Sequence, residues 1–171
     1  MLDFAYMHKS ELQSEYARTL LLPKFKYQSL FSWIDFGMNI VESMYSNIQM
    51  VSLNTEGKVI GYFSCSYDRQ SNIASSIYAV NFADKPTPEF AKDLHRFLDS
   101  LFTIHFARKL EWCVLIGNPA EKQYDKICKK YGGRIVGTFH KTFKILGGEI
   151  CDAKYYELFR DDYEYFKQRI V

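Results

Sequence analysis

A long amphipathic helix lies between two strand-like segments, and this arrangement constrains the fold more than any other feature of the sequence. Its apolar stripe has helical spacing and consists of Phe90, Leu94, Phe97, Leu98, Leu101 and His105. Thr87 suits the N-cap position, and Pro88 suits the first turn, where its missing N–H costs nothing. Residues 110–116 then read as a buried strand without clean alternation, as is typical beside a parallel neighbour. The pattern predicts a parallel pair of strands linked by this helix.

Further strands are predicted on both sides of the helix. Before it, polar turns separate three strand-like runs at residues 48–53, 59–67 and 76–83, which predicts an antiparallel meander. After it, Gly147 and Gly148 separate two longer runs, which predicts a closing hairpin of residues 134–146 and 149–159.

Two more helices complete the predicted order. Residues 20–47 carry apolar positions three to four residues apart, which favours a helix. The other helix has Asn118 as N-cap, Pro119 in its first turn and Glu121 in a capping-box-like position, and it ends at Gly132. The sequence therefore predicts an α/β fold, in which a central, mostly antiparallel mixed sheet has helices on both faces.

Composition narrows the class of protein. The 171 residues contain no repeat or linker, so we expect a single domain over residues 1–171. Hydrophobic residues make up 47% and charged residues 25%, which excludes a disordered or collagen-like chain. The net charge of +2 is too low for a strong phosphate-binding footprint, so we expect no nucleic-acid or membrane partner. The aromatic share of 17% predicts a thick core or a pocket for a flat ligand.

The four cysteines lie far apart and match neither a disulfide framework nor a zinc-site spacing with the histidines. The first residues lack the basic-then-apolar order of a signal peptide. No apolar stretch approaches the ~20 residues that span a bilayer. We therefore expect a cytoplasmic protein without a metal site.

Several local sequences, in this order, resemble those of the GCN5-related N-acetyltransferase (GNAT) superfamily. They are Gly-Lys-Val-Ile-Gly-Tyr-Phe from Gly57, Tyr-Ala-Val-Asn-Phe from Tyr78, Gly-Asn-Pro from Gly117, Tyr-Gly-Gly-Arg-Ile-Val-Gly from Tyr131, and Asp-Ala-Lys-Tyr-Tyr-Glu-Leu from Asp152. The resemblance covers residues 48–160 and is most specific at its C-terminal end. It implies a GNAT-like fold, acetyl-CoA bound in an opening between the fourth and fifth strands, and direct transfer of the acetyl group to an amine.

The resemblance also implies which residues contact the cofactor. The backbone of Val80, Asn81 and Phe82 corresponds to the strand edge that bonds the pantetheine arm. Asn118 corresponds to an asparagine that contacts the CoA arm, although its position also suits an N-cap.

The family's pyrophosphate-binding loop, Arg/Gln-x-x-Gly-x-Gly/Ala, is degenerate in this chain. Residues 86–91 occupy its positions, and only Ala91 agrees. A helix N-terminus still binds phosphate through free N–H groups, here those of Glu89, Phe90 and Ala91, with the Thr87 hydroxyl beside them. The negatively charged Glu89 carboxylate would repel a pyrophosphate bound at this position. By themselves these residues favour an ordinary helix start, and only the wider resemblance favours a cofactor site.

Direct transfer needs a proton donor for the departing thiolate. The resemblance implies a tyrosine on the helix after the fifth strand, and Tyr124 and Cys128 compete for that position, one turn apart on the same helix face. We expect Tyr124 to be the acid, because a phenol with a pKa near 10 is protonated at pH 7. Without the resemblance, the favoured interpretation of Tyr124 is a core residue.

The sequence assigns neither a general base nor an acceptor. The candidate bases His140, Glu149, Asp152 and Glu157 all lie on or beside the closing hairpin and have equally good structural interpretations. Aromatic residues between positions 31 and 36 are candidates for an acceptor pocket, but core packing is as good an explanation. Lys122, Lys126, Lys129 and Lys130 form a basic stripe, best explained as a solvated helix face.

The predicted function is acetyl transfer from acetyl-CoA to a primary amine, with Tyr124 as the general acid. The alternative is a GNAT-shaped binding or regulatory module that has lost catalysis, which the degenerate loop and Glu89 favour. The identity of the amine, and whether the chain is a monomer or a homodimer, stay open.

Overall fold

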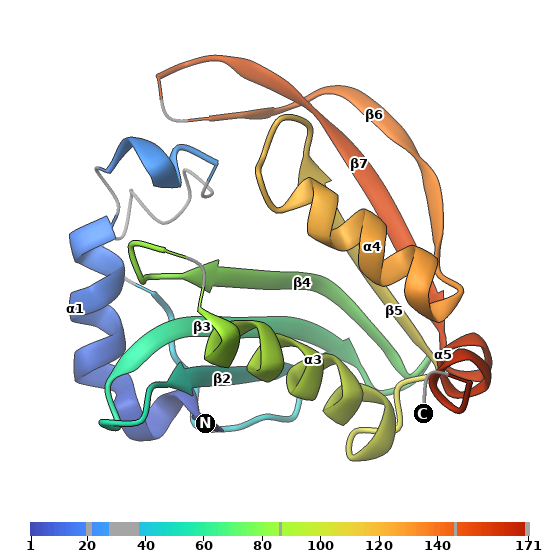
Figure 1. Cartoon of the computed structure of the whole chain (residues 1–171), viewed down its shortest axis with the longest axis horizontal. Coiled ribbons are helices and arrows are strands. Elements are labelled where there is room, and N and C mark those ends of the chain that lie inside the picture. Colours follow the sequence, from blue (N-terminus) through green and yellow to red (C-terminus); the bar gives the residue numbers. More distant parts are fainter. Residues whose placement is uncertain (20–21, 28–37, 86, 146, 170–171) are drawn as a thin grey trace.

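The computed structural model describes residues 1–19, 22–27, 38–85, 87–145 and 147–169, and one seven-stranded sheet forms its centre. The strands are β1 (Leu2–Phe4), β2 (Asn47–Leu53), β3 (Val59–Asp68), β4 (Ile73–Asn81), β5 (Lys109–Leu115), β6 (Arg134–Lys144) and β7 (Ile150–Phe159). The helices are α1 (Lys9–Thr19), α3 (Pro88–Thr103), α4 (Glu121–Tyr131) and α5 (Arg160–Lys167), and short 3-10 turns occur at Ala5–His8 and Pro23–Phe25. The strand order is β1-β2-β3-β4-β5-β7-β6, in which only the β4–β5 pair is parallel (Figure 1).

The predicted architecture is confirmed from β2 to β7. The meander β2-β3-β4, the crossover through α3 to a parallel β5, and the β6–β7 hairpin all form within a few residues of their predicted bounds. The long helix also begins as predicted, because the Thr87 hydroxyl accepts a hydrogen bond from the Phe90 N–H (3.3 Å) and Pro88 stands in the first turn.

The N-terminal region differs from the prediction of one helix over residues 20–47. Residues 38–46 are irregular, and residues 22–27 contain only the Pro23–Phe25 turn, while the rest of the predicted helix lies outside the described residues. Helix α1 precedes this region and was not predicted. It is only weakly amphipathic and buries just Leu12, Tyr16 and Thr19, so apolar spacing gives little signal for it. Strand β1 and helix α5 were also missed.

The start of α4 corrects a second prediction. Asn118 is not the N-cap, because the helix begins at Glu121 and the capping position is Ala120. The side-chain oxygen of Asn118 instead accepts the Ala120 N–H (2.9 Å) in a turn ahead of the helix. Glu121 reaches back to the Gly117 N–H (3.2 Å), and the helix ends as predicted at Gly132, which has a positive φ of 76°.

Strands β4 and β5 pair at only one end. Their ladder consists of Ile73 opposite Lys109 and Ala74 opposite Leu110. Ser76 then has a positive φ of 53°, at a point where the β3–β4 register also shifts, and such irregularities bend a strand. Beyond this bend the two strands diverge, and Figure 1 shows β4 and β5 running apart toward α1 and toward the loop before α4. The sheet is therefore open between its two halves.

Helices cover both faces of the sheet. One cluster of buried side chains joins the sheet to α3, α4 and α5, and a second cluster joins it to α1 and the Pro23–Phe25 turn. In β4, Ile77 and Ala79 belong to the first cluster, whereas Tyr78 and Val80 belong to the second. This alternation follows from the two-residue period of a strand.

Gly61 of β3 lets the first turn of α3 approach the sheet closely. A Cβ atom at this position would overlap the ring of Phe90 and lie 2.9 Å from the carbonyl oxygen of Val80. The Phe90 ring stacks on Phe63 with 5.0 Å between centroids. This contact fixes the N-terminal end of α3 beside the open end of β4.

Candidate active site

A cleft of about 240 Å³ occupies the opening between β4 and β5. It is lined by Lys24, Phe25, Tyr27, Tyr78, Ala79, Val80, Asn81, Phe90, Leu94, Asn118, Ala120, Gln123 and Tyr124. Ala79 and Tyr124 belong to the core on the α3–α4 face, and Tyr78 and Val80 to the core on the α1 face. Because the lining includes side chains from both faces, the cleft passes through the plane of the sheet.

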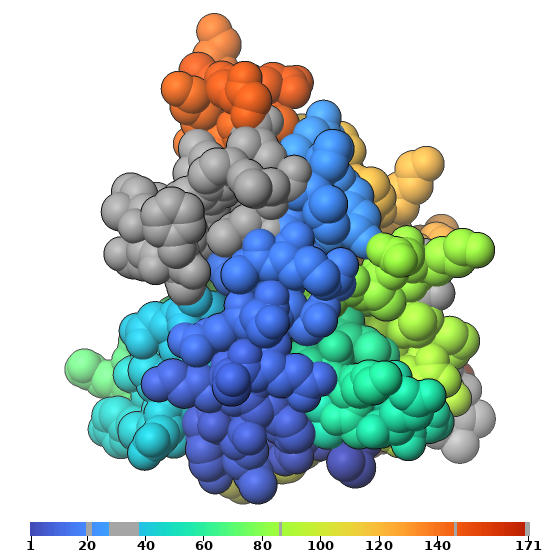
Figure 2. All heavy atoms as spheres, turned by 90° about the vertical axis from the view of Figure 1, so that its left-hand side faces the viewer, coloured from blue at the N-terminus to red at the C-terminus, as the bar shows by residue number. Residues whose placement is uncertain are grey.

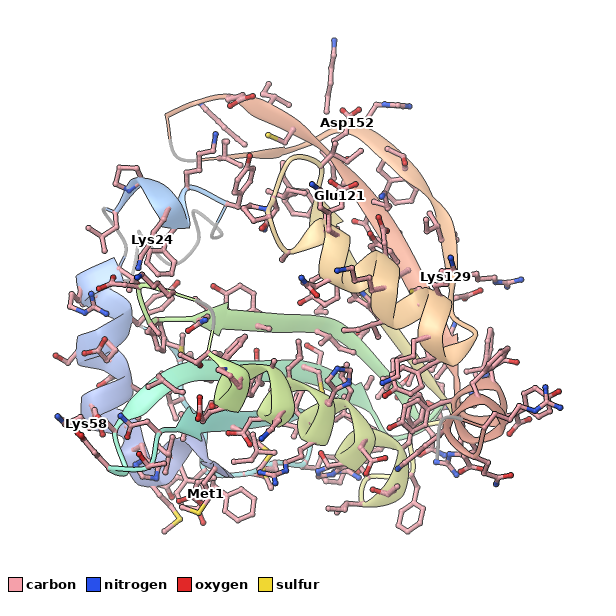
Figure 3. The ribbon with its side chains drawn as sticks, viewed as in Figure 1. Met1, Lys24, Lys58, Glu121, Lys129 and Asp152 are labelled. Carbon is pink, nitrogen blue, oxygen red and sulfur yellow. The ribbon has the colours of Figure 1, made fainter. Side chains whose placement is uncertain are left out.

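Residues 22–27 contribute Lys24, Phe25 and Tyr27 to the lining, and the sequence did not indicate any of the three as a site residue. Lys24 holds this segment against the end of β4, since its ammonium group pairs with Asp84 (2.9 Å) and donates to the carbonyl oxygen of Ala83 (3.5 Å). Figure 2 shows the blue atoms of this segment against the yellow-green atoms after β4, and Figure 3 shows Lys24 across the opening from Glu121 of α4. No motif marks these residues, because their role depends on where the chain passes after α1.

Five of the predicted site residues line the cleft, namely Val80, Asn81, Phe90, Asn118 and Tyr124. Four do not. Phe82 is buried in the α1-side core, and Thr87, Glu89 and Ala91 lie at the start of α3 outside the lining.

The N-terminus of α3 offers fewer free donors than the sequence predicts. The Phe90 N–H bonds to the Thr87 hydroxyl, and the Ala91 N–H bonds to the Thr87 carbonyl oxygen (3.2 Å). The expectation of free N–H groups is therefore wrong for both residues. Pro88 has no N–H, which leaves that of Glu89, and the Glu89 side chain is exposed beside it.

Tyr124 and Cys128 share a helix face, yet only Tyr124 lines the cleft. The Tyr124 ring packs against Trp112 of β5 and Tyr156 of β7, with centroids 5.9 and 6.2 Å away. Burial raises the pKa of the Tyr124 hydroxyl to about 12, so it stays protonated across the physiological range. The Cys128 thiol packs at the end of α4 against Gly133, and burial raises its pKa to about 12 as well.

Charged side chains hold α4 onto the β5–β7 half of the sheet. Lys154 of β7 pairs with Glu121 (2.6 Å) and Asp125 (3.2 Å) of α4, and the Tyr156 hydroxyl donates to Asp125 (2.8 Å). The hydrogen bond from Lys154 lowers the pKa of Glu121. These contacts fix the helix that carries Tyr124.

The candidate bases lie away from the cleft. His140 bonds to Asp152 (2.8 Å) on the β6–β7 hairpin, where the His140 side chain is 78% exposed, and Figure 3 shows Asp152 on the outer part of that hairpin. Glu157 pairs with Arg134 and with Lys109 (3.4 Å), and Glu149 is exposed. None of them lines the cleft.

Tyr78 is one of three tyrosines that line the cleft, with Tyr27 and Tyr124, and no motif in the sequence marks it as a site residue. Its hydroxyl is buried without a hydrogen-bond partner among the described residues. The signal in the sequence is weak, because an aromatic residue on a strand usually belongs to the core.

The described residues contain no group of three or more His, Cys, Asp or Glu side chains that could hold a metal ion. They also contain no helix with the length and apolar character of a membrane span.

Comparison with known proteins shows that this is the GNAT fold. The chain is similar in structure to a chimera of the Vibrio cholerae spermidine N-acetyltransferase SpeG and hSSAT, with a TM-score of 0.72 and 19% sequence identity over 96% of this chain and 99% of that one. A second such chimera has a TM-score of 0.69 and 17% identity over 96% and 98%. The spermidine/spermine N-acetyltransferase SpeG from Vibrio cholerae in complex with manganese ions has a TM-score of 0.61 and 20% identity over 71% and 70%. No protein-family model matches the sequence, and no similar curated protein is found.

Proposed function

We propose that this protein is an N-acetyltransferase that moves the acetyl group of acetyl-CoA directly to a primary amine. The observation that carries the proposal is the cleft through the sheet at the divergence of β4 and β5, where Tyr124 lies opposite the unpaired part of β4. The shared fold with spermidine N-acetyltransferases supports the same reaction class.

In the proposed reaction, the open edge of β4 at Val80 and Asn81 hydrogen-bonds the pantetheine arm, and Asn118 contacts the arm from the side of α4. The Asn118 oxygen already binds the Ala120 N–H, so its NH₂ group serves as the donor. The neutral amine nitrogen bonds to the carbonyl carbon, the C–S bond breaks, and the sulfur takes the proton of the Tyr124 hydroxyl. The proton that the amine nitrogen loses returns to Tyr124 through water. The Tyr124 hydroxyl is protonated at neutral pH, as a proton donor must be, although burial raises its pKa to about 12 and so makes it a weaker acid than a free phenol.

The lining of the cleft favours an acceptor with an apolar body. Among the described residues it is mostly aromatic and aliphatic, and Lys24 is its only charged side chain. A second ammonium group on the acceptor would therefore find no carboxylate among the lining residues that the structure describes. We expect a monoamine such as phenethylamine to be acetylated faster than spermidine.

The test is an acetylation assay with a panel of amines. The purified protein is incubated with acetyl-CoA and each amine, CoA release is followed with a thiol reagent, and the product is identified by mass spectrometry. An acetylated amine, formed only with protein and acetyl-CoA, supports the proposal. Cofactor binding without transfer to any amine would favour a non-catalytic module, which the exposed Glu89 at the first turn of α3 also favours.

We further propose that the protein works in the cytoplasm. Cys65, Cys113, Cys128 and Cys151 are all unpaired in the structure. Free thiols of this kind are typical of a reducing compartment.

A further inference from the structure

The Tyr78 hydroxyl is a buried donor that the fold leaves unused. Its side chain lines the cleft, and its hydroxyl oxygen has no hydrogen-bond partner in the described part of the chain. Buried polar groups are almost always paired, because an unpaired one carries the full penalty of its lost hydration. An exception inside a cleft points to a partner supplied by a ligand.

The neighbouring Tyr62 shows how the surroundings of the Tyr78 hydroxyl differ from those of another buried tyrosine. Tyr62 of β3 lies on the same face, with its ring centroid 6.3 Å from that of Tyr78, but its hydroxyl is not among the buried polar atoms without a partner, and the side chains of Ser64 and Gln49 lie near enough to lower its pKa. Burial raises the pKa of Tyr78, and nearby Tyr16, Tyr62 and Tyr124 raise it further. The Tyr78 hydroxyl therefore keeps its proton and acts as a hydrogen-bond donor.

Of the three tyrosines that line the cleft, Tyr78 and Tyr124 approach it from opposite faces of the sheet, and Tyr27 comes from the segment after α1. Tyr124 belongs to the α3–α4 side and Tyr78 to the α1 side, and they are close enough for Tyr124 to affect the pKa of Tyr78. A thioester has two polar atoms, a sulfur and a carbonyl oxygen, attached to the same carbon. If Tyr124 serves the sulfur, the carbonyl oxygen still needs a donor, since negative charge develops on it during transfer.

We propose that the Tyr78 hydroxyl donates a hydrogen bond to the carbonyl oxygen of the acetyl thioester. This inference rests on the proposed function. When the amine nitrogen bonds to the carbonyl carbon, the π pair of the C=O bond moves onto the oxygen that Tyr78 holds. The pair returns as the C–S bond breaks, and Tyr78 keeps its own proton throughout. Tyr78 thus stabilises the oxyanion, while Tyr124 supplies the proton to sulfur.

This role predicts that Tyr78 distinguishes acetyl-CoA from CoA, because only the former has a carbonyl oxygen at this point. The test measures the Kd of acetyl-CoA, CoA and S-ethyl-CoA by calorimetry for the wild type, Tyr78→Phe and Tyr62→Phe. S-ethyl-CoA has nearly the size of acetyl-CoA but no carbonyl oxygen. Tyr62→Phe makes the same chemical change outside the cleft lining.

We expect Tyr78→Phe to weaken acetyl-CoA binding by about 3- to 10-fold, as the loss of one hydrogen bond implies. Its affinity for CoA and S-ethyl-CoA should stay within about twofold of wild type, and Tyr62→Phe should not change the ratio of the three constants. Unchanged acetyl-CoA binding in Tyr78→Phe, or an equal loss for all three ligands, would overturn the inference while leaving the proposed function in place. A wild-type protein that binds none of the three would overturn both.

The stability of the ligand-free variant gives an independent readout. Because Tyr78→Phe removes an unpaired buried hydroxyl, its unfolding temperature should equal or exceed that of the wild type. Tyr62→Phe removes a hydroxyl that lies beside the polar side chains of Ser64 and Gln49, so it should not raise the unfolding temperature in the same way. A Tyr78→Phe protein that is destabilised or unfolded would show that its hydroxyl has a partner within the chain, which contradicts the inference.

Discussion

The two walls of the cleft are held in different ways. The β4 wall depends on close apolar packing, in which the missing side chain of Gly61 lets Phe90 reach the sheet. The β5 wall depends on charge, with Lys154 of β7 tying Glu121 and Asp125 to the sheet. The ladder between β4 and β5 has two residue pairs among the described residues. The two sides share one buried cluster, but near the opening each has its own contacts, so a substitution there should affect one side of the site more than the other.

The largest expected effect comes from the chemistry at the β5 wall. Tyr124→Phe should lower the turnover number by about 100-fold or more, with little change in acetyl-CoA affinity, because only the proton for the leaving thiolate is lost. Steady-state kinetics with the best amine of the panel, together with calorimetry, separate these two quantities. Tyr131→Phe is the matched control, since Tyr131 is a buried tyrosine of the same helix that does not line the cleft. Normal turnover in Tyr124→Phe would exclude Tyr124 as the acid.

The pH profile tests the same assignment. A hydroxyl whose pKa is raised to about 12 remains an acid up to that pH. The rate should therefore keep rising to about pH 10, because a primary amine has a pKa of about 10 and only its neutral form reacts, and no alkaline decline should precede that pH. A decline with a midpoint near pH 8 or 9, in a protein that is still folded there, would assign the acid to another group.

The next largest effect is expected from the packing of Phe90 against Gly61, on the β4 side of the cleft. Gly61→Ala should lower the unfolding temperature by roughly 3–10 °C, because its Cβ would overlap the Phe90 ring, and such overpacking costs about 1–3 kcal/mol. Scanning calorimetry measures the shift. Gly137→Ala is the control, since a Cβ there meets nothing within 4 Å. Equal stability of the two variants would show that Phe90 is not held against β3.

The stability that the Lys154 contacts contribute should depend on pH, whereas the stability from the packing of Phe90 on Gly61 should not. The pKa of Glu121 is lowered by its bond to Lys154, so this pair stabilises the fold above the unfolded pKa of about 4.3, and that stabilisation is lost as the pH falls through the lower folded value. Lys154→Met should therefore lower the unfolding temperature by about 2–4 °C at pH 7, for a loss of about 1 kcal/mol, and by much less at pH 3.

A control for this variant is Lys58→Met, which removes an exposed pair with Glu56 whose side chains are both about two-thirds exposed. It should have almost no effect at either pH. A deficit in Lys154→Met that is the same at pH 3 and pH 7 would mean that Lys154 acts through packing and not through its charge.

The smallest effect is expected at the start of α3. Glu89→Gln should strengthen acetyl-CoA binding by about two- to fivefold if Glu89 faces the pyrophosphate, because a repulsive carboxylate is removed. The gain should shrink at high salt, where exposed charges are screened. Glu164→Gln, at an exposed site on α5, is the control. Weaker binding by Glu89→Gln would show that the carboxylate helps to hold the loop.

The sequence predicts the regions whose structure is set by local patterns, and it does not predict those that are set by tertiary contacts. Residues 47–159 follow regular periods with clear caps and turns, so local chemistry specifies their strands and helices. The opening of the sheet depends on the bend at Ser76, where a residue other than glycine has a positive φ, and no pattern predicts that. Helix α1 and the segment around Lys24 are placed by tertiary contacts, and their sequence carries little periodicity.

The candidate site was predictable where a residue type has one obvious chemistry. Tyr124 and Asn118 were named from the resemblance, and both line the cleft. Asn118 was nevertheless assigned the wrong local role, because an asparagine before Pro119 suits a turn as well as an N-cap. Tyr78 was missed because its unpaired hydroxyl is a property of the packed structure, not of the sequence.

The most direct test of the central claim, that the cleft between β4 and β5 binds acetyl-CoA for transfer, is a thermal-shift titration with acetyl-CoA, CoA and ATP. At 100 times its Kd, a ligand stabilises the fold by about 2.7 kcal/mol, which is a rise of roughly 5–10 °C for a chain of this size. The account predicts such a rise with acetyl-CoA and with CoA but not with ATP. No shift at millimolar acetyl-CoA, or an equal shift with ATP, would contradict it.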